Sequence, residues 1–237
     1  MCTTINGVNM GSIISWKRSN LYREYPLDPS CRLINIIKRG NIAESNGCDS
    51  YNRNHFLNEC AAILQHWPYE PDNYDDRFTE YLVVTDPSGN SQLGSLRLLR
   101  TDRAHVLGSV FPDLCKYGVP SGLSIREINQ IHLSPKMSGK RRRTVANQLA
   151  SALIQYALLM EIESFTVVIE SIWSDFVQTM GWRCEPLGPI QTIGEIQLGA
   201  FRINVDGSTL KALRASKCYV ECDMWVMDPS IGFIPLQ

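Results

Sequence analysis

The sequence predicts a mixed α/β (α+β) fold, a three-layer sandwich in which helices cover a mixed central sheet. Several short runs are rich in β-branched and aromatic residues, which favours strands. One longer segment, at about residues 144–160, carries an Ala, Leu and Ile face at helical spacing. Strand and helix patterns alternate after that segment, and this order is typical of a mixed sheet covered by helices.

Length and charge suit one large domain. The chain has 237 residues, 23 basic against 24 acidic side chains and a formal net charge of −1. A near-neutral chain is not drawn as a whole to nucleic acid or to membranes, so we expect neither as a partner. We interpret residues 1–30 as an N-terminal extension, 31–217 as the folded domain and 218–237 as a C-terminal tail.

The sequence also indicates where the protein works. The N-terminus lacks the apolar core of a signal peptide, and no run approaches the ~20 apolar residues of a membrane span. We therefore expect a cytoplasmic protein. Its eight cysteines and four histidines are scattered without zinc-ligand spacing, so we expect reduced thiols and no metal site.

The first half of the chain predicts an early strand, a helix and then a hairpin. Residues 32–38 are β-branched, and 53–65 place apolar residues at helical spacing. Residues 39–52 are rich in Gly, Asn and Ser, which indicates a loop. The runs TEYLVVTD and SQLGSLRLLRT predict two strands joined by a turn at 87–90.

The second half predicts alternating elements after short helical pieces within 102–121. Residues 124–134 indicate a buried strand, and a loop at 135–143 precedes the helix of 144–160. FTVVIE is nearly continuously apolar, which is typical of a central strand. Further elements follow: a short helix at 171–180, strands at 182–188 and 195–205, and a helix at 208–215. The tail at 218–237 has no strong pattern.

An acidic turn and an arginine strand are the first candidates for chemistry. Asp72 and Asp75 stand three residues apart in an aromatic-rich loop, where they can converge on one cation or ammonium group. The alternative is a capped turn whose acids face water. Arg97 lies among leucines, so we expect it to be partly buried and paired with Asp72, Asp75 or Glu127, in either a functional or a purely structural ion pair.

Glu127 is the candidate base. It lies in the strand SIREINQIHLS, on the face opposite Ile128. Burial there would favour its protonated form unless an arginine such as Arg97 holds it charged. Such a carboxylate could take a proton from an amine, directly or through water, or it could serve only to pair with Arg97.

A basic run stands before the long helix, at Lys140, Arg141, Arg142 and Arg143. Four positive charges could hold a phosphopantetheine group or an acidic carrier protein. A nucleic-acid patch or a solvated charge run are the other interpretations. A basic, Gly-containing loop before a long helix in a mixed sheet resembles the N-acetyltransferase superfamily, in which a helix N-terminus receives such groups.

Taken in order, the motifs resemble the acyl-homoserine-lactone (autoinducer) synthase family. The resemblance runs from Asp72 to about Arg214, through DNYDD, YLVV, GSLRLLRT, HVLGSVFPDLC, GVPSG, REINQ, LSP and MGWRCEPLGP. It implies an N-acetyltransferase-like fold for residues 31–217. It also implies an enzyme that acylates the amino group of S-adenosylmethionine from acyl carrier protein or acyl-CoA, then lactonises the product and releases methylthioadenosine. No permanently bound cofactor is implied.

By position, the resemblance assigns roles to individual residues. Asp72 and Asp75 would bind the amino acid part of S-adenosylmethionine, Arg97 would organise them, and Glu127 would act as base or hold a water. Trp67, Phe111 and Gln130 would complete the S-adenosylmethionine side. The donor side would comprise the basic run and the residues of the acyl pocket, namely Lys140, Arg141, Arg142, Arg143, Thr166, Val168, Trp173 and Phe176.

The chain also departs from the family pattern. Gln130 stands where the family usually has an arginine, and a guanidinium is not replaced by an amide as a charge. Arg100 replaces a proline, and Trp67 lies unusually near Asp72. These departures keep two alternatives open: an acyltransferase of the same fold that uses another amine, and a homologue that binds acyl ligands without catalysis.

Overall fold

The computed structural model describes residues 72–86 and 91–221 together with five strands outside those ranges. The first two of these strands are β1 (Thr4–Ile5) and β2 (Val8–Asn9), which pair antiparallel. The chain divides into two compact units. One unit holds residues 1–15, 98–131 and 153–219, here called the Glu127 unit. The other holds residues 16–97, 132–152 and 220–237, here called the Arg97 unit.

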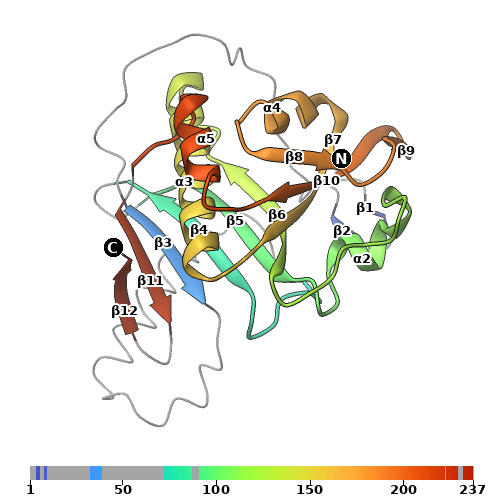
Figure 1. The fold of residues 1–237 in the computed structure, drawn as a ribbon, viewed down its shortest axis with the longest axis horizontal. Coiled ribbons are helices and arrows are strands. Elements are labelled where there is room, and N and C mark those ends of the chain that lie inside the picture. Colours follow the sequence, from blue (N-terminus) through green and yellow to red (C-terminus); the bar gives the residue numbers. More distant parts are fainter. Residues whose placement is uncertain are drawn as a thin grey trace. The chain divides into compact units, whose positions relative to one another are not determined.

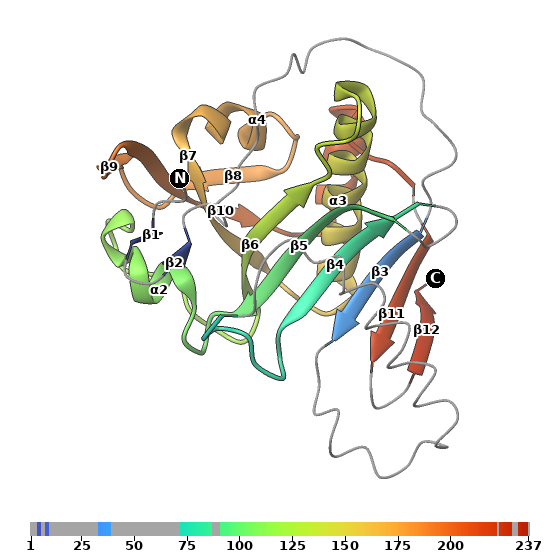
Figure 2. The same ribbon diagram turned by 180° about the vertical axis from the view of Figure 1, so that it is seen from behind.

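In the Arg97 unit, segments from both ends of the chain lie side by side. The strand order is β12 (Gly232–Leu236), β11 (Asp223–Asp228), β3 (Leu33–Lys38), β4 (Glu80–Thr85) and β5 (Gln92–Arg100). β11 runs parallel to β3, whereas β3–β4 and β11–β12 are antiparallel (Figure 2). Every residue of β4 is buried, and so is the middle of β5. Arg97 therefore stands on a strand in the interior of the unit.

The long helix α3 (Gly139–Leu159) begins five residues earlier than the sequence predicts. The expected loop at 135–143 is thus wrong at its end, because Lys140–Arg143 form the first turn of the helix. Two hydrogen bonds to Ser138 fix this start. The Arg142 N–H donates to its carbonyl at 2.9 Å, and the Arg141 N–H donates to its Oγ at 3.4 Å. Unbranched Lys and Arg are good helix formers, so the basic run does not oppose the extension.

In the Glu127 unit, β7 (Ser164–Glu170) lies between two longer strands. β6 (Ile125–Leu133) pairs with it in parallel and β10 (Ile196–Asn204) pairs antiparallel (Figure 1). β8 (Arg183–Pro186) and β9 (Gln191–Ile193) both pair antiparallel with β10. All residues of β7 but the last are buried, as its nearly continuous apolar sequence predicts.

Short helices complete the Glu127 unit. α2 (Val106–Val110) packs against β7, and the one-turn helices η2 (Pro112–Leu114) and η3 (Ser171–Trp173) pack against β10. α4 (Ser174–Gln178) follows η3 directly, and α5 (Thr209–Ala215) follows β10 (Figure 1). Among the residues that the structure describes, no helix is both long and apolar enough to cross a membrane.

The mixed α/β class is confirmed, and most elements lie where the sequence predicts them. The strands β1, β2, β9, β11 and β12 were not predicted. Three expectations lie outside the described residues: the loop at 39–52, the helix at 53–65 and the turn at 87–90. The short helical pieces within 102–121 correspond to α2 and η2.

Replacement of Gly188 by alanine is expected to destabilise the protein. A Cβ there would lie 2.4 Å from the Leu114 carbonyl oxygen and 3.0 Å from the Lys116 amide nitrogen, and both are backbone atoms that cannot rotate away. We expect a loss of about 1–3 kcal/mol in the free energy of unfolding, measured by urea denaturation. Gly207→Ala is the control, because nothing lies within 4 Å of its Cβ position. Equal stability of the two variants would contradict this packing.

Candidate functional site

Asp72 and Asp75 form a tight turn that closes on itself. The Asp75 N–H donates to the Asp72 carbonyl at 3.1 Å, and the Asp72 N–H donates to Asp75 Oδ2 at 2.9 Å. The Tyr74 N–H donates to Asp72 Oδ1 at 2.9 Å. Aspartate side chains commonly bond to backbone N–H groups two residues on, which is why this sequence turns here. Both carboxylates are held by the backbone of their own turn.

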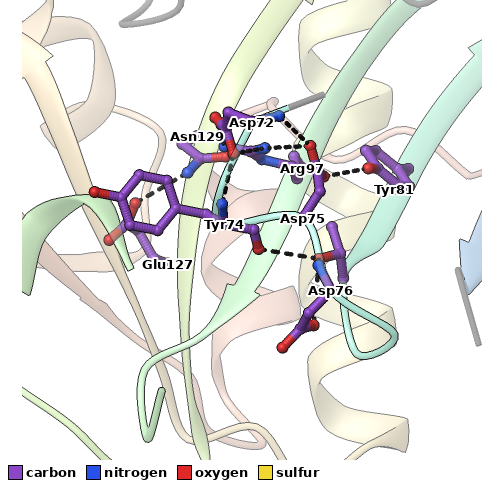
Figure 3. A network of polar contacts seen from close by, with 9 residues as sticks. Asp72, Tyr74, Asp75, Asp76, Tyr81, Arg97, Glu127 and Asn129 are labelled. Atoms are coloured by element: carbon purple, nitrogen blue, oxygen red, sulfur yellow. Dashed lines mark hydrogen bonds and ion pairs between the residues drawn. The ribbon is translucent and has the colours of Figure 1, made fainter. Parts of the chain in front are cut away.

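Arg97 joins the two acids (Figure 3). Its two terminal nitrogens contact the two oxygens of Asp72 at 2.9 Å each, and Nη1 also lies 3.1 Å from Asp75 Oδ2. This fork-to-fork contact is the strongest geometry for an arginine and a carboxylate. The expectation that Arg97 is buried and paired is confirmed, with both aspartates as partners.

Tyr81 supplies a further contact that the sequence did not predict. Its hydroxyl lies 2.5 Å from Asp75 Oδ1, so both oxygens of Asp75 have partners in this cluster. Tyr81 is the second residue of β4, close after the acidic turn. The sequence shows only a tyrosine in an apolar strand. That pattern does not distinguish a core tyrosine from one whose hydroxyl bonds to an acid.

The two acids differ in exposure. The side chain of Asp75 is 3% exposed and that of Arg97 is 1% exposed, whereas Asp72 keeps 34% of its side-chain surface. Asp75 therefore does not face water as the capped-turn alternative requires. Asp72 is the member of the cluster that a ligand can reach.

Electrostatics keep Arg97 charged. Burial alone would lower the pKa of Arg97, but the hydrogen bond to Asp72 and the charges of Asp72 and Asp75 outweigh it, and the net result is a raised pKa. Two carboxylates share this one guanidinium, so the three residues together carry one excess negative charge. This arrangement can attract a positively charged group to the exposed side of Asp72.

Glu127 is buried and held from two elements. Its side chain is 1% exposed. The Leu107 N–H, in the first turn of α2, donates to Oε2 at 2.8 Å. Asn129 Nδ2 donates to Oε1 at 3.0 Å (Figure 3). Neither donor was predicted from the sequence, because Leu107 uses its backbone and Asn129 has no motif of its own.

Thr166 and Val168, the expected acyl-pocket residues of β7, lie on the same strand face as Glu127. The β6–β7 register places Glu127 opposite Thr166, and paired residues share a face. Thr166 is fully buried and its hydroxyl makes no hydrogen bond. Phe111, which ends α2, is also buried, and α2 packs against β7. A buried hydroxyl without a partner is unusual and suits a site that receives a ligand.

Gln130 has an uncommon backbone. Its φ is +48°, in the left-handed region, although it lies within β6 and is almost fully buried. Non-glycine residues held in this region within a strand are strained and cluster at functional sites.

The remaining expected residues lie on α3, η3 and α4. Lys140 is exposed, and Arg141–Arg143 are half-buried in the first turn of α3. Arg142 donates to the carbonyls of Pro135 and Met137 at 3.2 and 3.4 Å, so it closes the turn before the helix. Trp173 is buried in η3 and Phe176 is half-buried in α4. Trp67 lies outside the described residues.

The described cysteines are free thiols, at Cys115, Cys184 and Cys218. Burial, reinforced by the charge of Glu185, raises the pKa of Cys184 to about 11, and burial also raises that of Cys115. Both are therefore protonated near neutral pH and poor nucleophiles. Within residues 72–86 and 91–221, no three His, Cys, Asp or Glu side chains could hold a metal ion.

Replacement of Arg97 by glutamine is expected to reduce stability by about 3–5 kcal/mol, because it leaves the buried Asp75 without its charged partner. Arg100→Gln is the matched control on the same strand. Its pair with Asp102 is short, at 2.6 Å, but exposed, and such pairs contribute about 0–1 kcal/mol. Chemical denaturation measures both variants. A loss for Arg97→Gln no larger than that of the control would contradict a buried charge network.

The chain is similar to known proteins over the segment that holds these residues. The family model described as autoinducer synthase matches residues 66–213, which is more than half of the chain. An acyl-homoserine-lactone synthase of Rhizobium etli is 32% identical over 149 residues, which are 61% of this chain and 70% of the relative. Another, of Ralstonia nicotianae, is 28% identical over 150 residues, with 61% and 73% covered.

Solved structures show the same fold. The CoA-dependent acyl-homoserine lactone synthase BjaI, solved with SAM and isopentyl-CoA, superposes with a TM-score of 0.63 at 23% identity. The alignment covers 82% of this chain and 93% of that one. The synthase LasI gives a TM-score of 0.60 at 21% identity, with 78% and 96% covered. The family match covers the acidic turn, Arg97 and Glu127, and the chain belongs to the autoinducer synthase family.

Proposed function

We propose that this protein is an acyl-homoserine-lactone synthase of the cytoplasm. It transfers an acyl group from acyl carrier protein or acyl-CoA to the amino group of S-adenosylmethionine, and then closes the lactone. The observation that carries the proposal is the buried Arg97 bonded to both Asp72 and Asp75, within the segment that matches the family. S-adenosylmethionine and the acyl thioester are substrates, and no permanent cofactor takes part.

The acidic turn binds the amino acid part of S-adenosylmethionine. That substrate carries an ammonium group, and Asp72 presents a carboxylate that is oriented by Arg97 and still accessible. Asp75 is buried, with Tyr81 and Arg97 on its two oxygens. We therefore assign direct contact with the substrate to Asp72, and assign to Asp75 the positioning of Arg97. Phe111 and Gln130 also contact S-adenosylmethionine.

Glu127 takes the proton that acylation releases. Glu127 accepts a proton from the ammonium group, directly or through a water, which leaves a neutral amine. The amine nitrogen attacks the thioester carbonyl carbon, the C–S bond breaks, and a second N–H proton passes to the leaving thiolate. In the second step the carboxylate oxygen of the acylated substrate displaces the sulfonium sulfur, which forms the lactone and releases methylthioadenosine. No protein nucleophile is needed in either step.

The acyl donor binds to the remaining candidate residues. Thr166 is the register partner of Glu127 and lies with Val168 on one face of β7. The hydroxyl of Thr166 is available to a polar atom of the thioester. Trp173 and Phe176 extend the apolar lining. The charges of Lys140–Arg143 suit the phosphates of coenzyme A or of a phosphopantetheine arm.

The proposal is tested by supplying purified protein with S-adenosylmethionine and a panel of short, long and aryl acyl thioesters. We expect methylthioadenosine and a lipid-extractable lactone in equal amounts, measured by mass spectrometry. Glu127→Gln is expected to lower kcat on the order of 10²–10⁴-fold, since the amide cannot accept the proton. Lack of both products across the panel would refute the function, and unchanged turnover in Glu127→Gln would remove this residue from the mechanism.

Asp72→Asn is expected to raise the KM for S-adenosylmethionine at least about tenfold, because a charge-assisted bond to the ammonium group is lost. The KM for the acyl donor is expected to stay near the wild-type value. Asp102→Asn is the matched control, since Asp102 is also bonded through both oxygens to an arginine, Arg100, but lies outside the acidic turn. Initial-rate kinetics for both substrates check the outcome. Equal effects of the two variants would contradict the assignment.

A further inference from the structure

Glu127 has a hydrogen-bond donor on each of its carboxylate oxygens. Asn129 Nδ2 reaches Oε1 at 3.0 Å, and the Leu107 N–H reaches Oε2 at 2.8 Å. A glutamate side chain normally rotates about its last torsion with little restraint. Donors on both oxygens remove that freedom and fix the plane of the carboxylate.

The two donors come from different parts of the Glu127 unit. Asn129 is two residues beyond Glu127 on β6, so the two side chains leave the same face of the strand. Leu107 belongs to α2, which packs against β7. Glu127 is therefore held between its own sheet and a helix that covers it, and Asn129 is the side chain that completes this hold.

The chemistry of the two donors is also selective. A backbone N–H and an amide NH₂ can only donate, so both bonds favour the ionised carboxylate over its protonated form. Glu127 is almost fully buried, and burial without donors would favour the opposite. The amide thus favours the form of the carboxylate that can accept a proton.

We propose that Asn129 is a positioning residue for the acyl-transfer step, which it serves by holding the Glu127 carboxylate ionised and correctly oriented. This inference rests on the proposed function, in which Glu127 accepts a proton from the ammonium group. Asn129 itself touches no reacting atom. Its removal should therefore act through Glu127, on turnover rather than on the binding of either substrate.

The test compares Asn129→Ala and Asn129→Asp with the wild-type enzyme. We expect kcat to fall roughly 10–100-fold in Asn129→Ala, the size of effect for one hydrogen bond to a charged group, with both KM values within about twofold. Asn129→Asp keeps the shape but replaces the donor by a carboxylate, so its loss is expected to be at least as large. In a Glu127→Gln background, Asn129→Ala should cause little further loss.

Asn204→Ala is the matched control for loss of an Asn–Glu bond. Asn204 Nδ2 donates to Glu185 Oε1 at 2.9 Å on β10, and Glu185 is exposed. This variant is expected to keep wild-type kcat. Thermal unfolding of each variant separates a local effect from loss of the fold, and the kinetic comparison uses only variants whose unfolding midpoint lies above the assay temperature.

The outcomes separate this inference from the proposed function. If the wild-type protein makes no lactone, the proposed function fails and the role of Asn129 fails with it. If the wild-type enzyme is active but Asn129→Ala matches Asn204→Ala in kcat, only the inference is overturned. It is equally overturned if Asn129→Ala costs as much in the Glu127→Gln background as alone, or if the loss lies in KM.

Discussion

The site depends on a single buried guanidinium. Arg97 stands in the middle of β5, where leucines surround it, and it is tolerated there because two aspartates meet it at bonding distance. The acidic turn in its observed form needs Arg97 equally, since Asp75 is buried too. Strand, turn and the β4 tyrosine are thus fixed together, and the exposed carboxylate of Asp72 is oriented by residues that a substrate does not reach.

The acidic turn and Glu127 illustrate two different ways to hold an acid in place. Asp72 and Asp75 share the full positive charge of Arg97. Glu127 uses two neutral donors, a backbone amide and a side-chain amide, in the contacts described above. Neutral donors stabilise an anion less strongly than a cation does.

Sequence patterns predicted the elements and the charged residues of the site but not the contacts that set their geometry. Periodicity located β4–β7, and charge in an apolar strand located Arg97 and Glu127. Tyr81 and Asn129 escaped prediction although their partners are near in sequence, because neither residue type marks a donor to a carboxylate by itself. The start of α3 was misplaced because a basic, glycine-containing run looks like a loop, and only the contacts of Ser138 show that it continues the helix.

The pairing of β11 with β3 also bears on how the protein is made. Leu33 lies opposite Asp223, so about 190 residues of chain separate two parallel neighbours. Contacts this distant in sequence form late and slow folding. During synthesis β3 emerges first and must wait for its neighbour until about 190 further residues have been made. An uncovered strand edge over that interval invites pairing with other chains, so production of this protein should be sensitive to chaperones and to growth temperature.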